Sequence, residues 1–498
     1  MNVNPITRLD YPDPDVIRVE DTYYMVSTTM HFMPGCEILQ SFDLVHWEHV
    51  TYVYETLDHT DAQQLKSGQN IYGQGMWAAS LRYHEGRFYI CFVANDTRKT
   101  YLYTSEKIDG PWKKQLIEGF YHDGSLLFDE DGRNYIVYGN DEIWITELNE
   151  DLTAPKKDGL HRLLVSDHKN PELGYEGSHI QKINGYYYIF LVHSLRDRWM
   201  RTEACFYSDS LEGEFTGGDV LCDDRGYCGQ GVAQGGIVDT PDGKWYAMLF
   251  QDSGAVGRIP ILLPVTWKDH FPFFGQNGHV PEEIEVHSTR PGYIYQPLVG
   301  SDDFCNGLLP RWQFNHDPDP RYYHLDALQG TYTITTREVC TELTQAVNTL
   351  TQRMSYPSCA AEVTVDASAL KEGDVAGLCA LQSCYAAVGI TKHHGKYEVL
   401  MLDKKEDGIL DMTEGTVVES HQMDFRLEAD FCNMKDEARC YYRVNKGDWL
   451  PIGTVHKLYF KLDHFTGCRF GLFCYAAEET GGSACFRDFK YYDVDEIS

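Results

Sequence analysis

The chain has 498 residues, which is long for one compact core, so two domains are expected. Hydrophobic residues make up 43% of it and aromatic residues 13%, with 34 tyrosines, a globular composition that favours β structure. The formal net charge of −32 repels phosphate backbones and anionic lipid head groups, which argues against nucleic-acid and membrane partners and favours an uncharged substrate.

At the amino end, residues 1–6 have neither the basic start nor the apolar core of a signal peptide. No apolar run approaches the roughly 18 residues that span a bilayer. The 15 cysteines are odd in number and scattered, without a Cys-x-x-Cys pair, which favours reduced thiols over a disulfide framework or a zinc site. A cytoplasmic protein is therefore expected.

A hairpin pattern then recurs five times in the first half of the chain. Each copy has an apolar-rich run, a turn rich in Asp, Glu, Asn or Gly, and a run that closes on tyrosine, which is typical of a short β-hairpin. The copies open at Asp13, Trp77, Asp123, Glu176 and Gln234 and close at Tyr24, Tyr89, Tyr135, Tyr188 and Tyr246. This spacing predicts the five blades of a β-propeller. Because the first strand of each blade lies nearest the axis, the five opening residues should converge at one mouth.

The propeller pattern fades after Trp267, and the segment from 270 to 300 is expected to be a linker. Beyond Ser301, short alternating runs such as 330–334, 360–365 and 469–473 predict an antiparallel sandwich. The predicted fold is all-β: a five-bladed β-propeller over residues 1–300, with the linker from about 270, followed by a β-sandwich over residues 301–498.

Three of the opening residues, Asp13, Asp123 and Glu176, carry carboxylates. Two carboxylates across a pocket can cleave a glycosidic bond, one by protonating the departing oxygen and the other by activating water or attacking directly. Like charges in a narrow mouth push at least one pKa upward, which separates the acid role from the base role. The pattern therefore indicates a glycosidase.

The segments 11–14, 122–128 and 175–179 closely resemble motifs of glycoside hydrolase family 43, a family of five-bladed propellers that includes β-xylosidases and α-L-arabinofuranosidases. The segments 302–304 and 312–316 resemble the start of the concanavalin-like sandwich in the longer members. The resemblance implies that Asp13 is the general base that activates water and Glu176 the general acid. It implies that Asp123 tunes the pKa of the acid and holds its orientation, and that the anomeric centre is inverted.

The resemblance also implies four substrate-binding residues. Arg258 matches an arginine that reaches the sugar and the modulating aspartate, and Trp77 either stacks on a sugar or fills the channel. Met30 opens a segment that replaces the aromatic-rich wall more usual in xylosidases. Gln234 stands where many members have a histidine that holds calcium on the propeller axis, and its carbonyl oxygen suits a hard cation, so one axial Ca²⁺ with Gln234 as a ligand is an expectation.

The favoured function is an exo-acting, inverting hydrolase that removes terminal α-L-arabinofuranosyl residues, with β-D-xylosyl residues as a further substrate, from hemicellulose-derived oligosaccharides. One alternative is a β-xylosidase acting on xylo-oligosaccharides. Another is a carbohydrate-binding propeller without catalysis, which would keep Trp77 but would not need three carboxylates. The sequence leaves open the oligomeric state and whether the sandwich contributes to the pocket.

Overall fold

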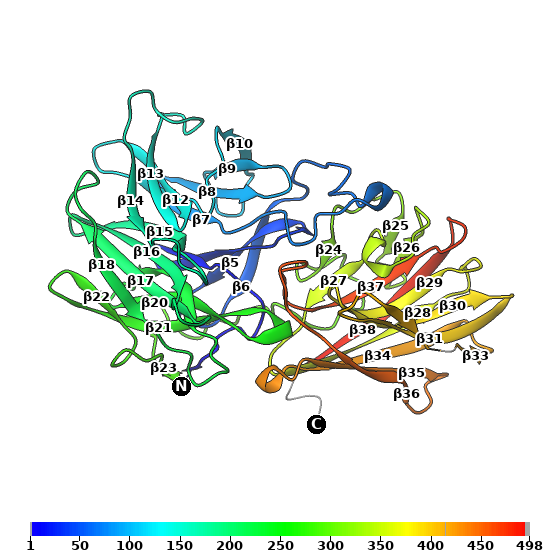
Figure 1. The fold of residues 1–498 in the computed structure, drawn as a ribbon. Helices are drawn as coiled ribbons and strands as arrows, with labels where there is room; N and C mark the ends of the chain where they lie inside the picture. The colour runs from blue at the N-terminus through cyan, green and yellow to red at the C-terminus, as the bar shows by residue number, and fades with distance from the viewer. Residues whose placement is uncertain (1, 414, 494–498) are drawn as a thin grey trace.

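The computed structural model describes residues 2–413 and 415–493, and Figure 1 shows a propeller and a sandwich built almost entirely of strands. The all-β prediction of a five-bladed propeller followed by a sandwich is confirmed. In these ranges the helical structure comprises four turns of 3-10 helix: η1 (Lys66–Gly68), η2 (Gly254–Val256), η3 (Leu343–Gln345) and η4 (Cys432–Met434). No helix within the described ranges is long and apolar enough to cross a membrane.

Five four-stranded antiparallel sheets form the propeller, and in each the strand order follows the chain. The first blade contains β2 (Asp15–Val19), β3 (Thr22–Ser27), β5 (Gly35–Ser41) and β6 (Glu48–Tyr54). The second contains β7 (Ser80–His84), β8 (Arg87–Ala94), β9 (Lys99–Ser105) and β10 (Lys113–Ile117). The third contains β11 (Ser125–Phe128), β12 (Asn134–Asn140), β13 (Glu142–Leu148) and β14 (His161–Ser166).

The fourth blade contains β15 (Glu176–Ile183), β16 (Tyr186–Ser194), β17 (Arg201–Ser208) and β18 (Thr216–Leu221). The fifth contains β19 (Val232–Asp239), β20 (Trp245–Asp252), β21 (Arg258–Lys268) and β22 (Phe271–Phe274). The ring closes because the first strands touch one another: β2 contacts β7 and β19, β11 contacts β7 and β15, and β15 contacts β19. Each predicted hairpin therefore forms the inner half of a blade.

The segment from about residue 270, which was expected to be a linker, begins with a β-strand. β22 completes the fifth blade by pairing with β21, and Phe274 is buried in the core between blades four and five. The chain then meets the amino-terminal segment, where β23 (Glu283–Ile284) pairs with β1 (Asn2–Val3). Further along, the hydroxyl of Thr289 donates to the carbonyl of Asp21 over 2.6 Å. The connection beyond β22 thus runs along the propeller and is anchored to it.

The sandwich has two sheets that enclose a core of buried apolar side chains. One contains β24 (Gln313–Asn315), β27 (Leu350–Arg353), β29 (Val375–Leu381), β30 (Ala386–His393), β31 (Lys396–Lys404), β32 (Leu410–Met412), β33 (Thr416–Val418) and β37 (Arg469–Tyr475). The other contains β25 (Tyr323–Asp326), β26 (Thr331–Thr335), β28 (Ser358–Asp366), β34 (Gln422–Asp430), β35 (Glu437–Val444), β36 (Leu450–Lys457) and β38 (Ser483–Asp493). Burial alternates along β26, as expected of a strand with one face on the core.

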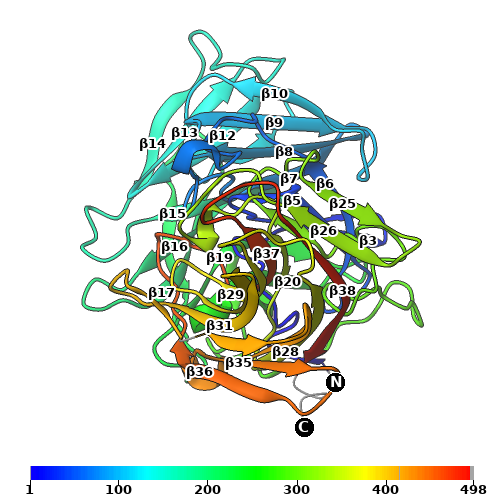
Figure 2. The same ribbon diagram turned by 90° about the vertical axis from the view of Figure 1, so that its right-hand side faces the viewer.

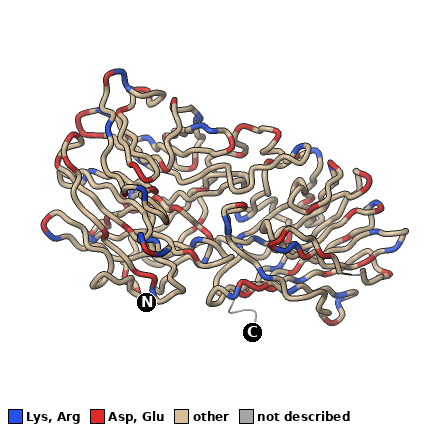
Figure 3. The backbone as a smooth tube through the Cα atoms, viewed as in Figure 1, with Lys and Arg blue, Asp and Glu red and all other residues tan. Residues whose placement is uncertain are grey.

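The two domains interlock, and Figure 2 views the molecule with the sandwich in front of the propeller. The propeller contributes β4 (Phe32–Met33), which pairs with β24 as the ninth strand of the first sandwich sheet. Ala255, Val256 and Ile259 of the fifth blade belong to the sandwich core. Acidic and basic residues are interspersed over both domains in Figure 3. All 15 cysteines are free thiols.

Candidate active site

The residues that open the five hairpins line one cavity of about 580 Å³ at an end of the propeller axis. The structure thus brings together Asp13, Trp77, Asp123, Glu176 and Gln234, and Arg258 joins them. Met30 is not among the residues that line this cavity. Met30 is buried, and its backbone pairs with that of Met76. The segment that follows it leads into β4, which pairs with the sandwich.

The backbone bends where these residues enter their strands. Asp13, Asp123 and Gln234 have φ values of 52°, 48° and 64°, in the left-handed region that non-glycine residues rarely adopt. Register shifts occur in β15 just after Glu176 and in β19 beside Gln234. Such strain and bulges cluster at functional sites because they redirect side chains, here towards the axis.

Two donors hold the side-chain carboxyl group of Asp13. The hydroxyl of Thr28 donates to its Oδ2 over 2.6 Å, and Nη1 of Arg258 lies 3.2 Å from its Oδ1. Arg258 is buried, and the ring of Phe465 lies 4.3 Å from its guanidinium carbon. The ion pair of Arg258 is therefore made with the expected base, Asp13, whereas the resemblance implied a contact with Asp123.

Asp123, His122 and Glu176 form a second group of charges. The amide of Gly177 donates to Oδ2 of Asp123 over 2.9 Å, and the side-chain amide of Asn140 donates to Oε2 of Glu176 over 2.7 Å. Nε2 of His122 lies 3.6 Å from Oδ2 of Asp123 and 3.5 Å from Oε2 of Glu176. His122 therefore bridges the two carboxyl groups, although only its neighbour Asp123 was singled out from the sequence.

These contacts shift two pKa values. The pKa of Asp123 is raised to about 6, mainly because burial disfavours its charged form; the charge of His122 opposes the rise, and those of Glu176 and Asp13 add to it. The pKa of His122 is raised to about 9, chiefly by the negative charge of Asp123. At neutral pH the imidazolium of His122 thus faces an ionised Asp123.

The sandwich supplies part of the cavity wall, which answers a question that the sequence left open. The contributing residues are Met434, Phe460, Lys461, Leu462 and Phe465. Phe465 lies with its ring centroid 5.5 Å from that of Trp77. Because Phe465 stands in an irregular loop with no repeated pattern around it, no signal in the single sequence marked it.

A further part of the wall comes from blades four and five. Its residues are Glu172, Leu173, Trp199, Arg201, Gln230 and Asp252. Nε of Arg201 donates to Oδ2 of Asp252 over 2.7 Å. None of these residues opens a hairpin, so the repeat pattern that found the carboxylates did not find them.

The axis beneath the cavity holds a guanidinium group. All five N–H donors of Arg82 have acceptors: Nε donates to Leu126 O, Nη1 to Asp15 Oδ2 and Leu81 O, and Nη2 to Ser125 Oγ and Ile180 O. These acceptors belong to the first four blades. Asp15 also accepts from the amide of Leu81 over 2.7 Å, and its Oδ1 lies 3.1 Å from Nδ1 of His179.

The axial residues do not fit a calcium ion. Ca²⁺ takes six to eight oxygen ligands, whereas both oxygens of Asp15 are already engaged and a cation already occupies the axis. Gln234 packs against Gly177, where an added Cβ would lie 2.7 Å from its Cγ. His122, Asp123 and Glu176 have ligand atoms within 4.8 Å of one another, but Nε2 of His122 already bridges the two carboxyl groups.

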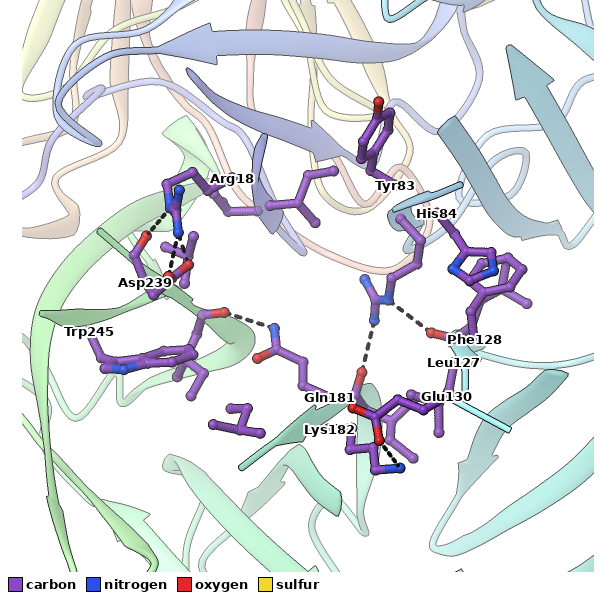
Figure 4. A pocket seen from close by; sticks show the side chains of 18 residues that line it. Arg18, Tyr83, His84, Leu127, Phe128, Glu130, Gln181, Lys182, Asp239 and Trp245 are labelled. Atoms are coloured by element: carbon purple, nitrogen blue, oxygen red, sulfur yellow. Dashed lines mark hydrogen bonds and ion pairs between the residues drawn. The ribbon is translucent and has the colours of Figure 1, made fainter. Parts of the chain in front are cut away.

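Figure 4 shows the opposite mouth of the propeller, a second cavity of about 480 Å³. Its charged side chains are paired: Arg18 binds Asp239, and Lys182 lies 3.0 Å from Glu130. Gln181 donates to the carbonyl of Ile237 over 2.8 Å. This mouth does not repeat the carboxylate arrangement of the first.

A propeller that gathers three carboxyl groups at one mouth is the arrangement expected of a glycoside hydrolase. Residues 3–272 match the family model of glycosyl hydrolases family 43, and the chain belongs to that family. Residues 301–492 match the family model described as the beta xylosidase C-terminal concanavalin A-like domain. The family membership predicted from the three motifs is confirmed.

Similar proteins cover almost the whole chain. A beta-xylosidase of Formosa agariphila is 26% identical over 99% of this chain and 89% of its own. A non-reducing end alpha-L-arabinofuranosidase of Bacteroides ovatus is 24% identical over 82% of this chain and 79% of its own. The solved structure of a bifunctional GH43-CE protein of Bacteroides eggerthii is 42% identical, with a TM-score of 0.92 over 99% of this chain. This chain spans 64% of the length of that bifunctional protein.

Proposed function

We propose that the protein is an exo-acting, inverting hydrolase that releases terminal α-L-arabinofuranosyl residues from hemicellulose-derived oligosaccharides. The observation that carries the proposal is the different setting of two carboxyl groups in one cavity. Asp13 is held by Arg258 and Thr28, whereas Glu176 lies beside Asn140 and His122. A fixed anion and a separate proton donor are what displacement by water requires.

In this mechanism, Asp13 removes a proton from water as the water attacks the anomeric carbon. Glu176 gives a proton to the departing oxygen. Because Oε2 of Glu176 accepts from Asn140 and faces His122, its Oε1 carries the transferable proton. Inversion requires the two reacting carboxyls to stand roughly 6.5–9.5 Å apart, with water between them.

Exo action is supported by the closed inner end of the cavity. Trp77 and Phe465 pack against each other beside Arg258, and the axis beneath is occupied by Arg82. An aromatic ring offers a flat apolar surface to one face of a sugar. The inner end thus suits a terminal residue and leaves no path for a polysaccharide to pass through.

β-D-Xylosidase activity is the second candidate, favoured by the match of the sandwich to a domain described for beta xylosidases. Relatives named for each activity align with this chain. The segment beginning at Met30, on which the preference for arabinose partly depended, lies away from the cavity, so it does not separate the two sugars.

The test is to incubate the protein with 4-nitrophenyl α-L-arabinofuranoside and β-D-xyloside in parallel, with Asp13→Asn and Glu176→Gln as variants. We expect each variant to lose about 10²- to 10⁴-fold in kcat/KM on the substrate that the parent cleaves. Proton NMR of the first product checks that the anomeric configuration is inverted.

Glu130→Gln is the matched control, since Glu130 is an exposed carboxylate at the opposite mouth and should not affect turnover. A parent that cleaves neither glycoside, or a Glu176→Gln variant that matches the parent, contradicts the proposal. Retained sugar binding without turnover in the parent would point instead to a carbohydrate-binding propeller.

A further inference from the structure

The cavity extends beyond the catalytic carboxylates along the wall that blades four and five provide. Glu176 opens β15 of blade four, and Trp199 and Arg201 stand where β16 connects to β17 in the same blade. Gln230 precedes β19, and Asp252 ends β20 of blade five. These residues therefore line the same cavity as Glu176, on the side that blades four and five provide.

Trp199 presents a large exposed surface at the cavity. The residue is 42% exposed, which is unusual for a tryptophan. The guanidinium carbon of Arg201 lies 5.2 Å from the ring, so Arg201 covers one face and steadies the indole. The exposed indole can therefore stack on the apolar face of a sugar ring.

Arg201 has donors that the protein does not use. Its side chain is 8% exposed, and it also packs 5.1 Å from the ring of Phe250. Within the described ranges only its Nε has a hydrogen-bond acceptor, Asp252, which leaves the four N–H groups of its terminal nitrogens. Because Arg201 lines the cavity and a guanidinium is costly to bury unsatisfied, these donors suit a ligand.

The charges on this wall favour a neutral ligand. Asp252 neutralises Arg201, and Glu172 adds a further negative charge nearby. An anionic sugar would meet no net positive charge on this wall, whereas sugar hydroxyls can accept from Arg201 without bringing charge. The cavity volume of about 580 Å³ lies within the range of sites that enclose ligands larger than one pentose.

We propose that Trp199 and Arg201 form the binding site for the leaving-group sugar, a neutral pyranose unit of the hemicellulose chain: Trp199 stacks on its ring, and Arg201 donates to its hydroxyls. The inference rests on the proposed function, because it places the sugar on the acid's side of the bond that is cleaved. It identifies two substrate-binding residues that the hairpin repeat does not mark.

The first experiment compares Arg201→Met with the parent on an arabinoxylo-oligosaccharide and on 4-nitrophenyl α-L-arabinofuranoside. The nitrophenyl group has no hydroxyls, whereas the charge of Arg201 acts on Glu176 and Asp13 in both reactions. We expect the fall in kcat/KM to be about 10- to 100-fold greater on the oligosaccharide than on the nitrophenyl glycoside. Arg201→Lys should recover part of the loss because it keeps a donor.

Arg198→Met is the matched control, since Arg198 is an exposed arginine in the same connection, is absent from the cavity wall and should leave both reactions unchanged. Equal losses on both substrates with Arg201→Met would assign Arg201 a structural role through Asp252. No loss on the oligosaccharide would overturn the proposal. Trp199→Ala, at an exposed position that tolerates truncation, should also lose about tenfold on the oligosaccharide.

A binding measurement separates this inference from the proposed function. Calorimetry measures the Kd of the oligosaccharide for Glu176→Gln and for the double variant Glu176→Gln with Arg201→Met. We expect the second substitution to raise Kd about tenfold even if the parent cleaves no substrate. An unchanged Kd would overturn the sugar site, whereas failed cleavage with a raised Kd would contradict only the proposed chemistry.

Discussion

The three carboxyl groups at the mouth hold equivalent positions in their blades, yet their surroundings differ. Asp13 is paired with Arg258, Asp123 is buried among other charges, and Glu176 accepts from Asn140. Pairs of titratable groups whose environments separate their pKa values are how one site supplies both acid and base. His122 is central to that separation because its charge acts on Asp123 and lies close to Glu176.

We predict that His122→Phe shifts the pH dependence of the reaction. The charge of His122 lowers the pKa of Asp123, so its removal should raise that pKa above about 6. A higher pKa keeps Asp123 protonated to a higher pH, and its negative charge is then missing from the site. The acid limb of kcat/KM should therefore move to higher pH, with a several-fold loss near pH 6, measured as a pH–rate profile.

His84→Phe is the control for this experiment, because His84 stacks on Phe128 at the opposite mouth. Its profile should match that of the parent. An acid limb that stays in place, or moves to lower pH, in His122→Phe would contradict the role given to His122.

At the scale of the blades, the first strands are joined around Arg82. A partly buried guanidinium with every donor used links four blades in a way that resembles a structural metal ion, but with fixed N–H directions. Asp15 is almost fully buried beneath it. Removing one partner of such a pair leaves an uncompensated buried charge, which costs about 3–5 kcal/mol.

We predict that EDTA leaves both turnover and the thermal unfolding temperature unchanged, whereas Arg82→Met lowers the unfolding temperature clearly. Differential scanning calorimetry with and without chelator measures both effects. Arg18→Met is the control, since Arg18 pairs with Asp239 at the more open mouth, where an ion pair contributes about 0–1 kcal/mol. A fall in unfolding temperature with EDTA, reversed by Ca²⁺, would show that a metal joins the blades.

The elements differ in how far they could be predicted. The hairpins were predictable because turn residues and apolar runs are local signals, and equal placement in five copies was enough to bring Asp13, Asp123 and Glu176 together. β22 could not be predicted, because a four-residue strand directly after a turn resembles the start of a loop in the sequence. Arg82, Arg201 and Phe465 gain their roles from distant segments that meet only when the ring closes and the sandwich docks, which no local pattern records.

At the scale of the whole molecule, the two domains complete each other. β4 of the propeller extends a sandwich sheet, and Phe465 of the sandwich completes the cavity of the propeller. Met30 was expected on the substrate wall but does not line the cavity. The two-residue strand that follows it and joins the sandwich carries no signal in the sequence. The sandwich sheet therefore includes a strand of the propeller, and the cavity wall includes residues of the sandwich.

We predict that a chain ending at residue 300 loses at least about 100-fold in kcat/KM on 4-nitrophenyl glycosides, because Phe465 no longer closes the site over Arg258. It should also associate, since the unpaired β4 and the apolar residues Ala255, Val256 and Ile259 become exposed. Enzyme assays and size-exclusion chromatography check both outcomes. Full activity in the monomeric short chain would contradict an essential contribution from the sandwich.

The occupied axis has a consequence for the order of events after hydrolysis. With Arg82 across the channel below, we expect substrate and products to use the same entrance. The proposed mechanism then implies that the leaving-group sugar departs first and that the released pentose, enclosed behind it, leaves last. Free pentose should therefore compete with each incoming chain end, and the enzyme should release its oligosaccharide after every cleavage.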